Sequence, residues 1–309
     1  MPEAKIGVMF PGQGAQRHGL GERWQEHPAW SVVERAESAL GRSLADLLLD
    51  PSADLDRTDN AQLTVLIASL MAWEAAAPTM AAPVGFAGHS LGQITALIAS
   101  KVLAFDDGIR LASARARHTQ EAAERRPGAM AALLGATLEQ AKESCDAVAG
   151  ACWVANENAP GQVVVAGTPA GVDAALERAA AIGVRRTSRL PVGGAFHTPL
   201  MDDARVAFTR ELARVDLSDP VAPVVSNGDG LASVDAEGWR TRLADHLVRP
   251  VRWRQSVETL VGLGATELVE VGPGTTLAGL ARRIVPGIPV RSIEVSPPSS
   301  APNNSEVFS

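Results

Sequence analysis

Cysteine is scarce in this sequence, and its scarcity bears on both the compartment and the type of fold. The 309 residues include two cysteines, Cys145 and Cys152. Two are too few for a disulfide framework and indicate a reducing compartment, so we expect a cytoplasmic location. The two could pair with each other, but two ordinary thiols are the better expectation.

Basic tracts and long apolar runs are also missing. The formal net charge is −7, and no basic tract of nucleic-acid-binding type occurs, so we expect no nucleic-acid partner. No run of about 18 or more uncharged apolar residues occurs, which argues against a membrane span. The N-terminal stretch MPEAKIGVMF has no basic region followed by a long apolar one, and so predicts no signal peptide.

Apolar residues are plentiful, at 46% of the chain, which is enough to bury a large core. Short apolar strands alternate with longer helical patterns. We expect strands at 5–10 and 84–87 and helices at 61–76 and 93–103. This alternation predicts an α/β fold with a parallel sheet covered by helices.

The pattern changes in the middle of the chain. AMAALLG, a helix at 138–149, CWVANENAPGQVVVAG, a helix at 169–182 and VRRTSRLPV form a β-α-β-β-α-β order, which is the ferredoxin-like arrangement. The α/β pattern then resumes, with APVVSN and ELVEVG as strands. We therefore predict a catalytic domain in two pieces, an inserted ferredoxin-like subdomain, and a disordered Pro/Ser/Asn-rich tail. The catalytic domain comprises residues 1–127 and 196–290, the ferredoxin-like subdomain residues 128–195, and the tail residues 291–309.

The stretch GFAGHSLGQITAL carries the first indication of chemistry. It contains the pattern G-x-S-x-G centred on Ser90, in which a serine on a sharp strand-to-helix turn has its hydroxyl lifted clear of the sheet. The pattern also arises by chance in loops rich in glycine and serine. Here an apolar strand precedes it and a helical pattern follows it. We therefore predict that Ser90 is a nucleophile.

A serine nucleophile needs a base, usually histidine, and hydrogen-bond donors for the oxyanion. Of six histidines, His197 has the best context, because it lies in PVGGAFHTPLM, a Gly-rich turn after the predicted insertion. A surface histidine near a helix start is the alternative. His89 lies inside the motif, and its side chain should point away from that of Ser90. The expected oxyanion donors are the backbone amide of Leu91 and one from the loop PGQGAQ at 11–16.

Other kinds of site fit the sequence less well. PGQGAQ is not a dinucleotide fingerprint, because Arg17 stands where the third glycine is required, and no Walker lysine follows. Asp202, Asp203 and Asp245 are candidates for the third member of a triad, but acids in the first turn of a helix are usually caps or solvated charges. No cluster with metal-ligand spacing is visible, so we expect no metal.

With these pieces in place, the chain resembles the malonyl-CoA:acyl carrier protein transacylases and the related acyltransferases of polyketide synthesis. The matching stretches are FPGQGAQ, GHSLG, RLASARARHTQE followed by PGAM, ANENAPGQVVVAG, GAFHTPLM, PVVSN, HLVRPVRW and EVGPG. Their common order is far more specific than any one of them. The resemblance implies an α/β-hydrolase-like large domain with an inserted ferredoxin-like subdomain.

The resemblance also assigns roles to particular residues. It implies a Ser-His dyad, two backbone oxyanion donors, residues that bind the acyl group, and supporting polar residues. The dyad is Ser90 with His197, and the oxyanion donors are the amides of Gln13 and Leu91. The residues that bind the acyl group are Arg115, Gln62 and Phe196. The supporting polar residues are His246 and Asn227. A planar guanidinium can bind a malonyl carboxylate through two hydrogen bonds, which suits Arg115. A solvated helix arginine, like Arg110 and Arg117 nearby, is the alternative.

Some positions depart from the pattern of the relatives. Gln93 stands where many have Glu, and His246 where Gln or Asn is frequent. His118 and Thr119 replace larger apolar residues, a change that predicts an altered acyl pocket. GAFH, which includes Phe196, resembles the form associated with selection of malonyl over methylmalonyl.

The function expected from the resemblance is acyl transfer, most simply of malonyl, from CoA to the phosphopantetheine thiol of an acyl carrier protein, in fatty-acid or polyketide biosynthesis. No bound cofactor is required, and we expect a monomer. The alternatives are a transferase that moves a bulkier acyl or aminoacyl chain between carriers, and a hydrolase of acylated carriers. Six arginines are candidates for docking an acidic carrier: Arg185, Arg186, Arg189, Arg249, Arg252 and Arg254.

Overall fold

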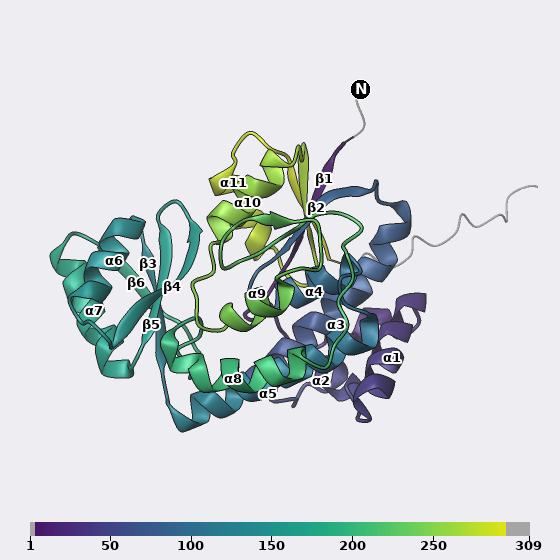
Figure 1. Cartoon of the computed structure of the whole chain (residues 1–309), viewed down its shortest axis with the longest axis horizontal. Helices are drawn as coiled ribbons and strands as arrows, with labels where there is room; N and C mark the ends of the chain where they lie inside the picture. The colour runs from purple at the N-terminus through teal and green to yellow at the C-terminus, as the bar shows by residue number, and fades with distance from the viewer. Residues whose placement is uncertain (1–3, 295–309) are drawn as a thin grey trace, which may run out of the picture.

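The computed structural model describes residues 4–294, which form a large lobe and a small lobe, each built on its own sheet (Figure 1). The large sheet has the strand order β10-β9-β1-β2-β7-β8. All neighbouring pairs are parallel except β7 with β8, which is antiparallel at one edge. Its strands are β1 Ile6–Phe10, β2 Pro83–Gly88, β7 Val224–Val225, β8 Ala232–Ser233, β9 Glu267–Val271 and β10 Val290–Ile293.

Helices cover both faces of the large sheet. They are α1 Ser31–Leu40, α2 Ala45–Leu49, α3 Thr58–Ala76, α4 Gly92–Ala99, α5 Phe105–Arg125, α8 Asp202–Leu212, α9 Trp239–Asp245, α10 Trp253–Gly262 and α11 Thr276–Ile284. Short 3₁₀ helices lie at η1 Glu22–Trp24, η2 Pro28–Trp30, η3 Ala77–Thr79 and η4 Pro199–Met201. The predicted α/β class and the mostly parallel sheet are confirmed.

Side-chain alternation along β1 explains why the sheet needs two helical layers. Val8 and Phe10 belong to the core that includes α3, α4 and α5. Met9, between them, packs with Val257 and Leu260 of α10 on the opposite face. Successive strand residues point to opposite faces, so a strand that is apolar throughout must be buried on both sides.

Helix α3 is the central helix of the large lobe. The stretch from Thr58 to Thr79 is long and apolar enough to cross a membrane, but 72% of the apolar window is buried inside the protein. It contacts α5, α1 and α4. An all-round apolar helix that other elements enclose is what a large core requires.

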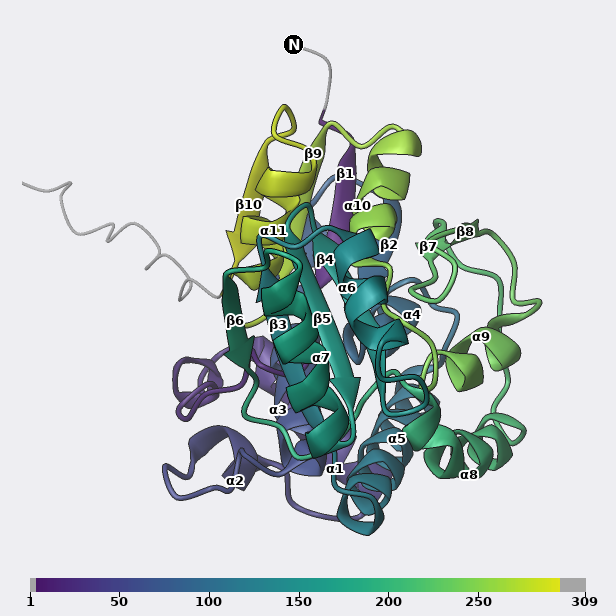
Figure 2. The ribbon, with the colours of Figure 1, turned by 90° about the vertical axis from the view of Figure 1, so that its left-hand side faces the viewer.

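The small subdomain comprises the second sheet and two helices. Its strands β3 Ala129–Leu134, β4 Cys152–Ala159, β5 Gln162–Gly167 and β6 Arg186–Arg189 form an antiparallel sheet in the order β4-β5-β3-β6. Helices α6 Leu138–Asp146 and α7 Pro169–Ala181 lie on one face of it (Figure 2). The observed order, β-α-β-β-α-β, is the predicted one, and these elements all fall between residues 128 and 195.

The two faces of the small sheet have different partners. Ala131 and Leu133 of β3 pack under α6 and α7, in the same cluster as Cys145 and Cys152. The thiols Cys145 and Cys152 are free and buried, with their sulfur atoms 3.8 Å apart. Met130 and Ala132 face the other way, toward the residues that lead into the large lobe.

One segment, residues 246–254, joins the two lobes. The backbone of Val251 pairs with β4, donating to the Ala155 carbonyl and accepting from the Glu157 amide, both at 2.9 Å. Arg254 forms an ion pair with Glu157 at 2.9 Å. The small sheet is therefore tied to the large lobe by main-chain hydrogen bonds as well as by its two connecting chains.

A buried carboxylate anchors the N-terminus of α11. Glu270 of β9 accepts hydrogen bonds from the backbone amides of Leu277 at 3.1 Å and Ala278 at 2.8 Å. Burial nevertheless raises the pKa of Glu270 to about 7, because desolvation outweighs these donors. Leu277 and Leu280 of α11 line the cleft described below, so this anchor sets one of its walls.

Several predicted boundaries were wrong. Helix α3 begins at Thr58 rather than at 61, and helix α6 ends at Asp146 rather than at 149. Helix α4 ends at Ala99 rather than at 103, since Lys101 has a left-handed backbone (φ 66°) that a helix cannot continue through. The predicted disordered tail, 291–309, begins too early, because 291–293 belong to β10 and pair in parallel with β9. The rest of that tail, from 295 onward, lies outside the described residues.

Candidate active site

Ser90 occupies the tip of a very tight turn between β2 and α4. Its backbone is left-handed (φ 52°), which is unfavourable for a residue with a side chain. A Cβ on Gly88 would lie 1.8 Å from the Gly92 carbonyl oxygen, and one on Gly92 would lie 2.2 Å from the Phe10 carbonyl oxygen. Close backbone packing therefore requires both glycines of the motif, and the sharp strand-to-helix turn is the one that the motif predicted.

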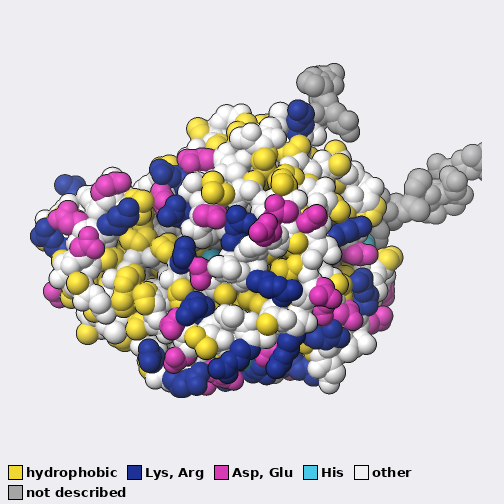
Figure 3. Space-filling view, viewed as in Figure 1, with side chains coloured by type: hydrophobic (Ala, Val, Ile, Leu, Met, Phe, Trp, Pro, Cys, Tyr) yellow, Lys and Arg dark blue, Asp and Glu magenta, His cyan; other side chains and the backbone are white. Residues whose placement is uncertain are grey.

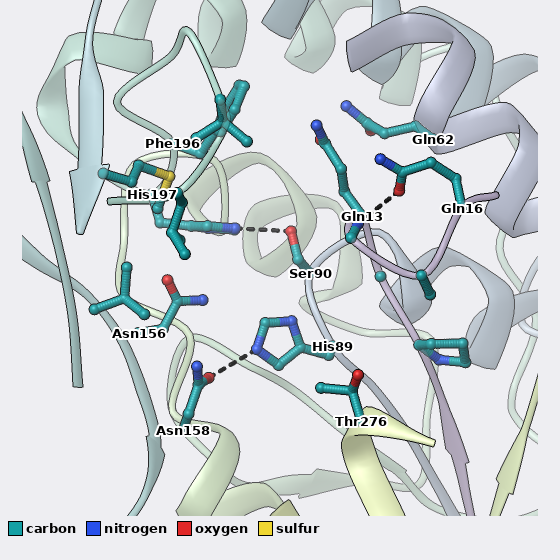
Figure 4. Close-up of a pocket in the computed structure, with 18 of the residues that line it drawn as sticks. Gln13, Gln16, Gln62, His89, Ser90, Asn156, Asn158, Phe196, His197 and Thr276 are labelled. Carbon is teal, nitrogen blue, oxygen red and sulfur yellow. Dashed lines mark hydrogen bonds between the residues drawn. The ribbon is translucent and has the colours of Figure 1, made fainter. Parts of the chain in front are cut away.

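His197 meets Ser90 from the loop that follows the small subdomain (Figure 4). Its Nε2 is 2.8 Å from Ser90 Oγ, and its Nδ1 is 2.8 Å from the backbone oxygen of His246. A carbonyl oxygen only accepts, so Nδ1 carries the proton and Nε2 is left as an acceptor. The ring is thus held in the tautomer that can take a proton from Ser90, and the alternative of a surface histidine is excluded, since His197 is buried.

Between residues 4 and 294, no carboxylate takes the third position of a triad. Asp202 pairs with Arg205, Asp203 with Arg126 and Asp245 with Arg249. The group that orients His197 is the His246 main chain instead. The His246 ring lies 4.8 Å from the His197 ring, and burial lowers its pKa well below the ordinary value, so it stays neutral.

Arg115 of α5 reaches the same oxygen atom. Its Nη2 lies 3.0 Å from Ser90 Oγ, and its Nη1 donates to Gln62 Oε1. The side chain is buried, not solvated, and within the described part of the chain it makes no ion pair with a carboxylate. Burial lowers its pKa to about 10, so the guanidinium remains charged at neutral pH.

These contacts fix the direction of every proton around Ser90. Arg115 can only donate to Ser90 Oγ, so the hydroxyl proton of Ser90 goes to His197 Nε2. Burial, followed by the Arg115 charge, lowers the pKa of His197 to about 3. The imidazole is therefore neutral at rest and available as a base.

Asn227 and Gln93 support the turn from behind. Asn227 Oδ1 accepts a hydrogen bond from the backbone amide of Ser90 at 2.8 Å, and Gln93 Oε1 accepts one from the backbone amide of Asn227 at 2.8 Å. Gln93, one of the departures noted in the sequence, thus supplies this acceptor with an amide oxygen. Among the described residues, no hydrogen bond engages the backbone amides of Gln13 or Leu91. Gln13 lines the cleft around Ser90, whereas Leu91 is buried and is not among the lining residues.

A cleft of about 310 Å³ surrounds Ser90 and is lined from both lobes. Gln62, Arg115 and Thr119 form one wall, while Met130, Val164 and Phe196 contribute apolar surface from the other side. Figure 3 shows the hollow between the lobes, with histidine surface visible inside it. Of the two departures predicted to alter the acyl pocket, Thr119 lines the cleft; His118 is not among the lining residues and lies beside Glu121 and Glu211.

Two asparagines of β4 reach the cleft although their sequence pattern had suggested no role for them. Asn156 and Asn158 both line the cleft, and Asn158 Oδ1 lies 2.9 Å from His89 Nε2 (Figure 4). This hydrogen bond holds the His89 ring away from Ser90, as predicted. The signal was available: two asparagines at alternate positions of one strand point to the same face.

Comparisons with known proteins agree with this geometry. The family described as acyl transferase domain matches residues 8–292. A malonyl CoA-acyl carrier protein transacylase of Bacillus subtilis is 34% identical over 96% of this chain and 95% of its own length. The protein of the same description from Escherichia coli K12 is 36% identical over 91% of this chain and 93% of its own.

Solved structures give the same result. A crystal structure of malonyl-CoA:acyl carrier protein transacylase from Xanthomonas oryzae superimposes with a TM-score of 0.90, at 37% identity and 96% coverage of both chains. A malonyl-transacylase solved in complex with its type II polyketide-synthase acyl carrier protein has a TM-score of 0.90, at 32% identity, with 95% of this chain and 97% of that chain covered.

Proposed function

The chain belongs to the acyl transferase domain family, and from that membership we propose that it moves a malonyl group from CoA to the phosphopantetheine thiol of an acyl carrier protein through an acyl-Ser90 intermediate. The relatives named above carry this activity in their descriptions. The observation that carries the proposal is that Ser90 Oγ contacts both His197 Nε2 and Arg115 Nη2. A base and a carboxylate-binding cation thus meet at one nucleophile.

The first half-reaction forms an ester on Ser90. Ser90 Oγ attacks the thioester carbonyl carbon while His197 Nε2 takes the hydroxyl proton. The free amides of Gln13 and Leu91 would donate to the oxyanion, as preorganised donors do in acyl transfer. The carbon–sulfur bond then breaks, and the departing CoA sulfur takes the proton from His197.

The second half-reaction reverses these steps with another thiol. The phosphopantetheine thiol of the carrier gives its proton to His197 and attacks the acyl-Ser90 carbonyl. Ser90 leaves and recovers the proton, which regenerates the free enzyme. The reaction therefore needs an acyl donor and then an acyl acceptor, and no resident cofactor.

Arg115 supplies selectivity for the acyl group. Its Nη2 lies 3.0 Å from Ser90 Oγ, the oxygen that becomes acylated. In a malonyl group the carboxylate carbon is only the second carbon after the carbonyl carbon that Ser90 attacks. A buried guanidinium without a carboxylate of its own is strongly stabilised when a substrate provides one. An acetyl group would leave the cation unpaired.

Arginines of the small subdomain and of segment 246–254 support docking of an acidic carrier. Of the six candidates, three are paired within the chain: Arg189 with Asp173, Arg249 with Asp245 and Arg254 with Glu157. In the described range, no ion pair engages the other three, Arg185, Arg186 and Arg252, which are exposed. Charge reversal at these three should raise the KM for the carrier and leave acylation by malonyl-CoA unaffected.

We further propose that the protein acts as a monomer in the cytoplasm. The Ser90 site is assembled from one chain, and the two thiols are free although their sulfur atoms are 3.8 Å apart. Light scattering of the pure protein, with and without the carrier, would test the oligomeric state.

Intact-mass analysis tests the central proposal. Incubation with malonyl-CoA should add one malonyl group to Ser90, and a carrier protein with its phosphopantetheine arm should then remove that group and gain it. Ser90→Ala should gain no acyl group. His197→Ala should acylate roughly 10²- to 10⁴-fold more slowly, which is the usual contribution of a general base. Acylation of Ser90→Ala at the wild-type rate would refute the mechanism; malonyl release to water without carrier would indicate a hydrolase.

A further inference from the structure

The buried side chain of Gln62 connects Arg115 to a hydroxyl group that the mechanism does not use. Gln62 lies on α3 and is 2% exposed. Its Oε1 accepts from Arg115 Nη1, and its Nε2 donates to Thr119 Oγ1 at 3.0 Å. Both ends of the amide are therefore occupied by residues of α5.

The chemistry of the two neighbours allows one orientation of this amide. The hydroxyl of Thr119 has a single proton, which goes to the backbone carbonyl of Arg115 at 2.9 Å or of Ala116 at 3.0 Å. Carbonyls only accept, so the Thr119 oxygen is left as an acceptor toward Gln62. A guanidinium only donates. Rotating the Gln62 amide by half a turn would place its NH₂ against Arg115 and its oxygen against the Thr119 oxygen.

The contact with Gln62 sets the direction of the Arg115 guanidinium. Because Gln62 Oε1 holds Arg115 Nη1, the other nitrogen, Nη2, is directed at Ser90 Oγ. The chain of donors runs from Arg115 through Gln62 and Thr119 back to the main-chain carbonyl of Arg115 itself or of Ala116. Thr119 is itself 2% exposed, so water does not readily replace its hydroxyl.

We infer that Thr119 is a positioning residue: through Gln62 it holds the Arg115 guanidinium in the direction that receives a substrate carboxylate, and it thereby favours malonyl over acyl groups without a carboxylate. The inference rests on the proposed function. It also changes the meaning of the departure at 119. A smaller residue there widens the cleft, but its hydroxyl adds a specific acceptor that an apolar residue cannot supply.

A matched pair of variants separates the hydroxyl from the volume of the side chain. Thr119→Val removes the hydroxyl at nearly constant volume, and Thr119→Ser keeps it. The measurement is the second-order rate constant for forming acyl-Ser90 from malonyl-CoA and from acetyl-CoA. We expect Thr119→Val to lower the malonyl/acetyl ratio by about 3- to 10-fold, the range of one neutral hydrogen bond. Thr119→Ser should keep a ratio near that of the wild type.

Two controls exclude a general structural effect. Thr209 of α8 makes the same kind of hydroxyl bond to the carbonyl four residues earlier, at 2.8 Å, on an exposed helix face away from the cleft. Thr209→Val should leave the ratio unchanged. Melting temperatures of all variants show whether the fold is retained.

A double-mutant cycle shows whether Thr119 acts through Gln62. In a Gln62→Ala background the relay has no middle member, so Thr119→Val should no longer change the ratio. A purely steric effect of residue 119 on the acyl group would persist in that background and would overturn the inference, as would a Thr119→Val ratio equal to that of the wild type. The proposed function stands or falls separately: it is refuted if the wild type itself shows no preference for malonyl-CoA.

Discussion

Replacement of Arg115 by alanine should convert a malonyl-selective site into one that treats malonyl and acetyl groups alike. Arg115 is 5% exposed and has two neutral oxygens, on Gln62 and Ser90, as its side-chain acceptors. A charge-assisted hydrogen bond contributes about 1.5–3 kcal/mol, which corresponds to a selectivity of roughly 10- to 150-fold. Arg115→Ala should lose this preference, and its relative rate with acetyl-CoA should rise, since no buried cation is left unpaired.

The assay is the ratio of acyl-Ser90 formed from malonyl-CoA and acetyl-CoA by quenched-flow mass analysis. Malonamyl-CoA, in which an amide replaces the carboxylate, is a matched neutral substrate and should behave like acetyl-CoA with the wild type. Arg110→Ala is the control variant, because Arg110 lies on the same helix but is exposed and paired with Asp106 and Asp107. A malonyl/acetyl ratio that Arg115→Ala leaves unchanged would refute the reasoning and favour a bulkier acyl substrate.

Three further outcomes are expected. Burial and the Arg115 charge lower the pKa of His197 to about 3, so the base is neutral above that pH and kcat/KM for acylation should show no inflection near the ordinary histidine pKa of 6.5. A loss of rate below pH 6.5 that follows a single protonation of His197 would contradict this prediction. Asn227→Ala leaves the Ser90 amide without its acceptor and should reduce the free energy of unfolding by about 1–3 kcal/mol, measured by urea denaturation, with Asn227→Asp retaining more of it. Glu270 has a folded pKa of about 7, above its unfolded value of 4.5, so its protonation stabilises the folded state; this stabilisation is complete below pH 4.5 and is lost as the pH rises through 7. Glu270→Gln should therefore flatten the melting-temperature profile between these pH values, and an equally steep profile in the variant would show that other groups cause the pH dependence.

Local patterns were sufficient to predict most of the fold. Short apolar runs located β1 and β2, and the pattern G-x-S-x-G around Ser90 predicted the turn whose tight packing the structure shows. The strand β10 was missed because VRSI is short and half polar, and it becomes a strand only by pairing with β9. Such pairing depends on residues far away in the sequence, which periodicity cannot detect.

The site shows a similar division. Motif context singled out Ser90 and His197, and the family resemblance added Arg115 and Gln62. The direct contact of Arg115 with Ser90 Oγ depends on atomic positions that no motif encodes. The acids considered for a triad were plausible by sequence and are simply turned elsewhere, each toward an arginine.

The segment 246–254 sets a limit on how such enzymes can be recombined. At one end its main chain orients His197, in its middle Val251 is paired to β4, and the amide of Arg252 donates to the Asn227 carbonyl at 2.9 Å. A chimera that exchanges only residues 128–195 would place a foreign strand edge against Val251, and any shift of that strand would be passed to both the catalytic base and the support of Ser90. The unit of exchange is therefore the small subdomain together with 246–254, two stretches separated in the gene that have to be transplanted as one.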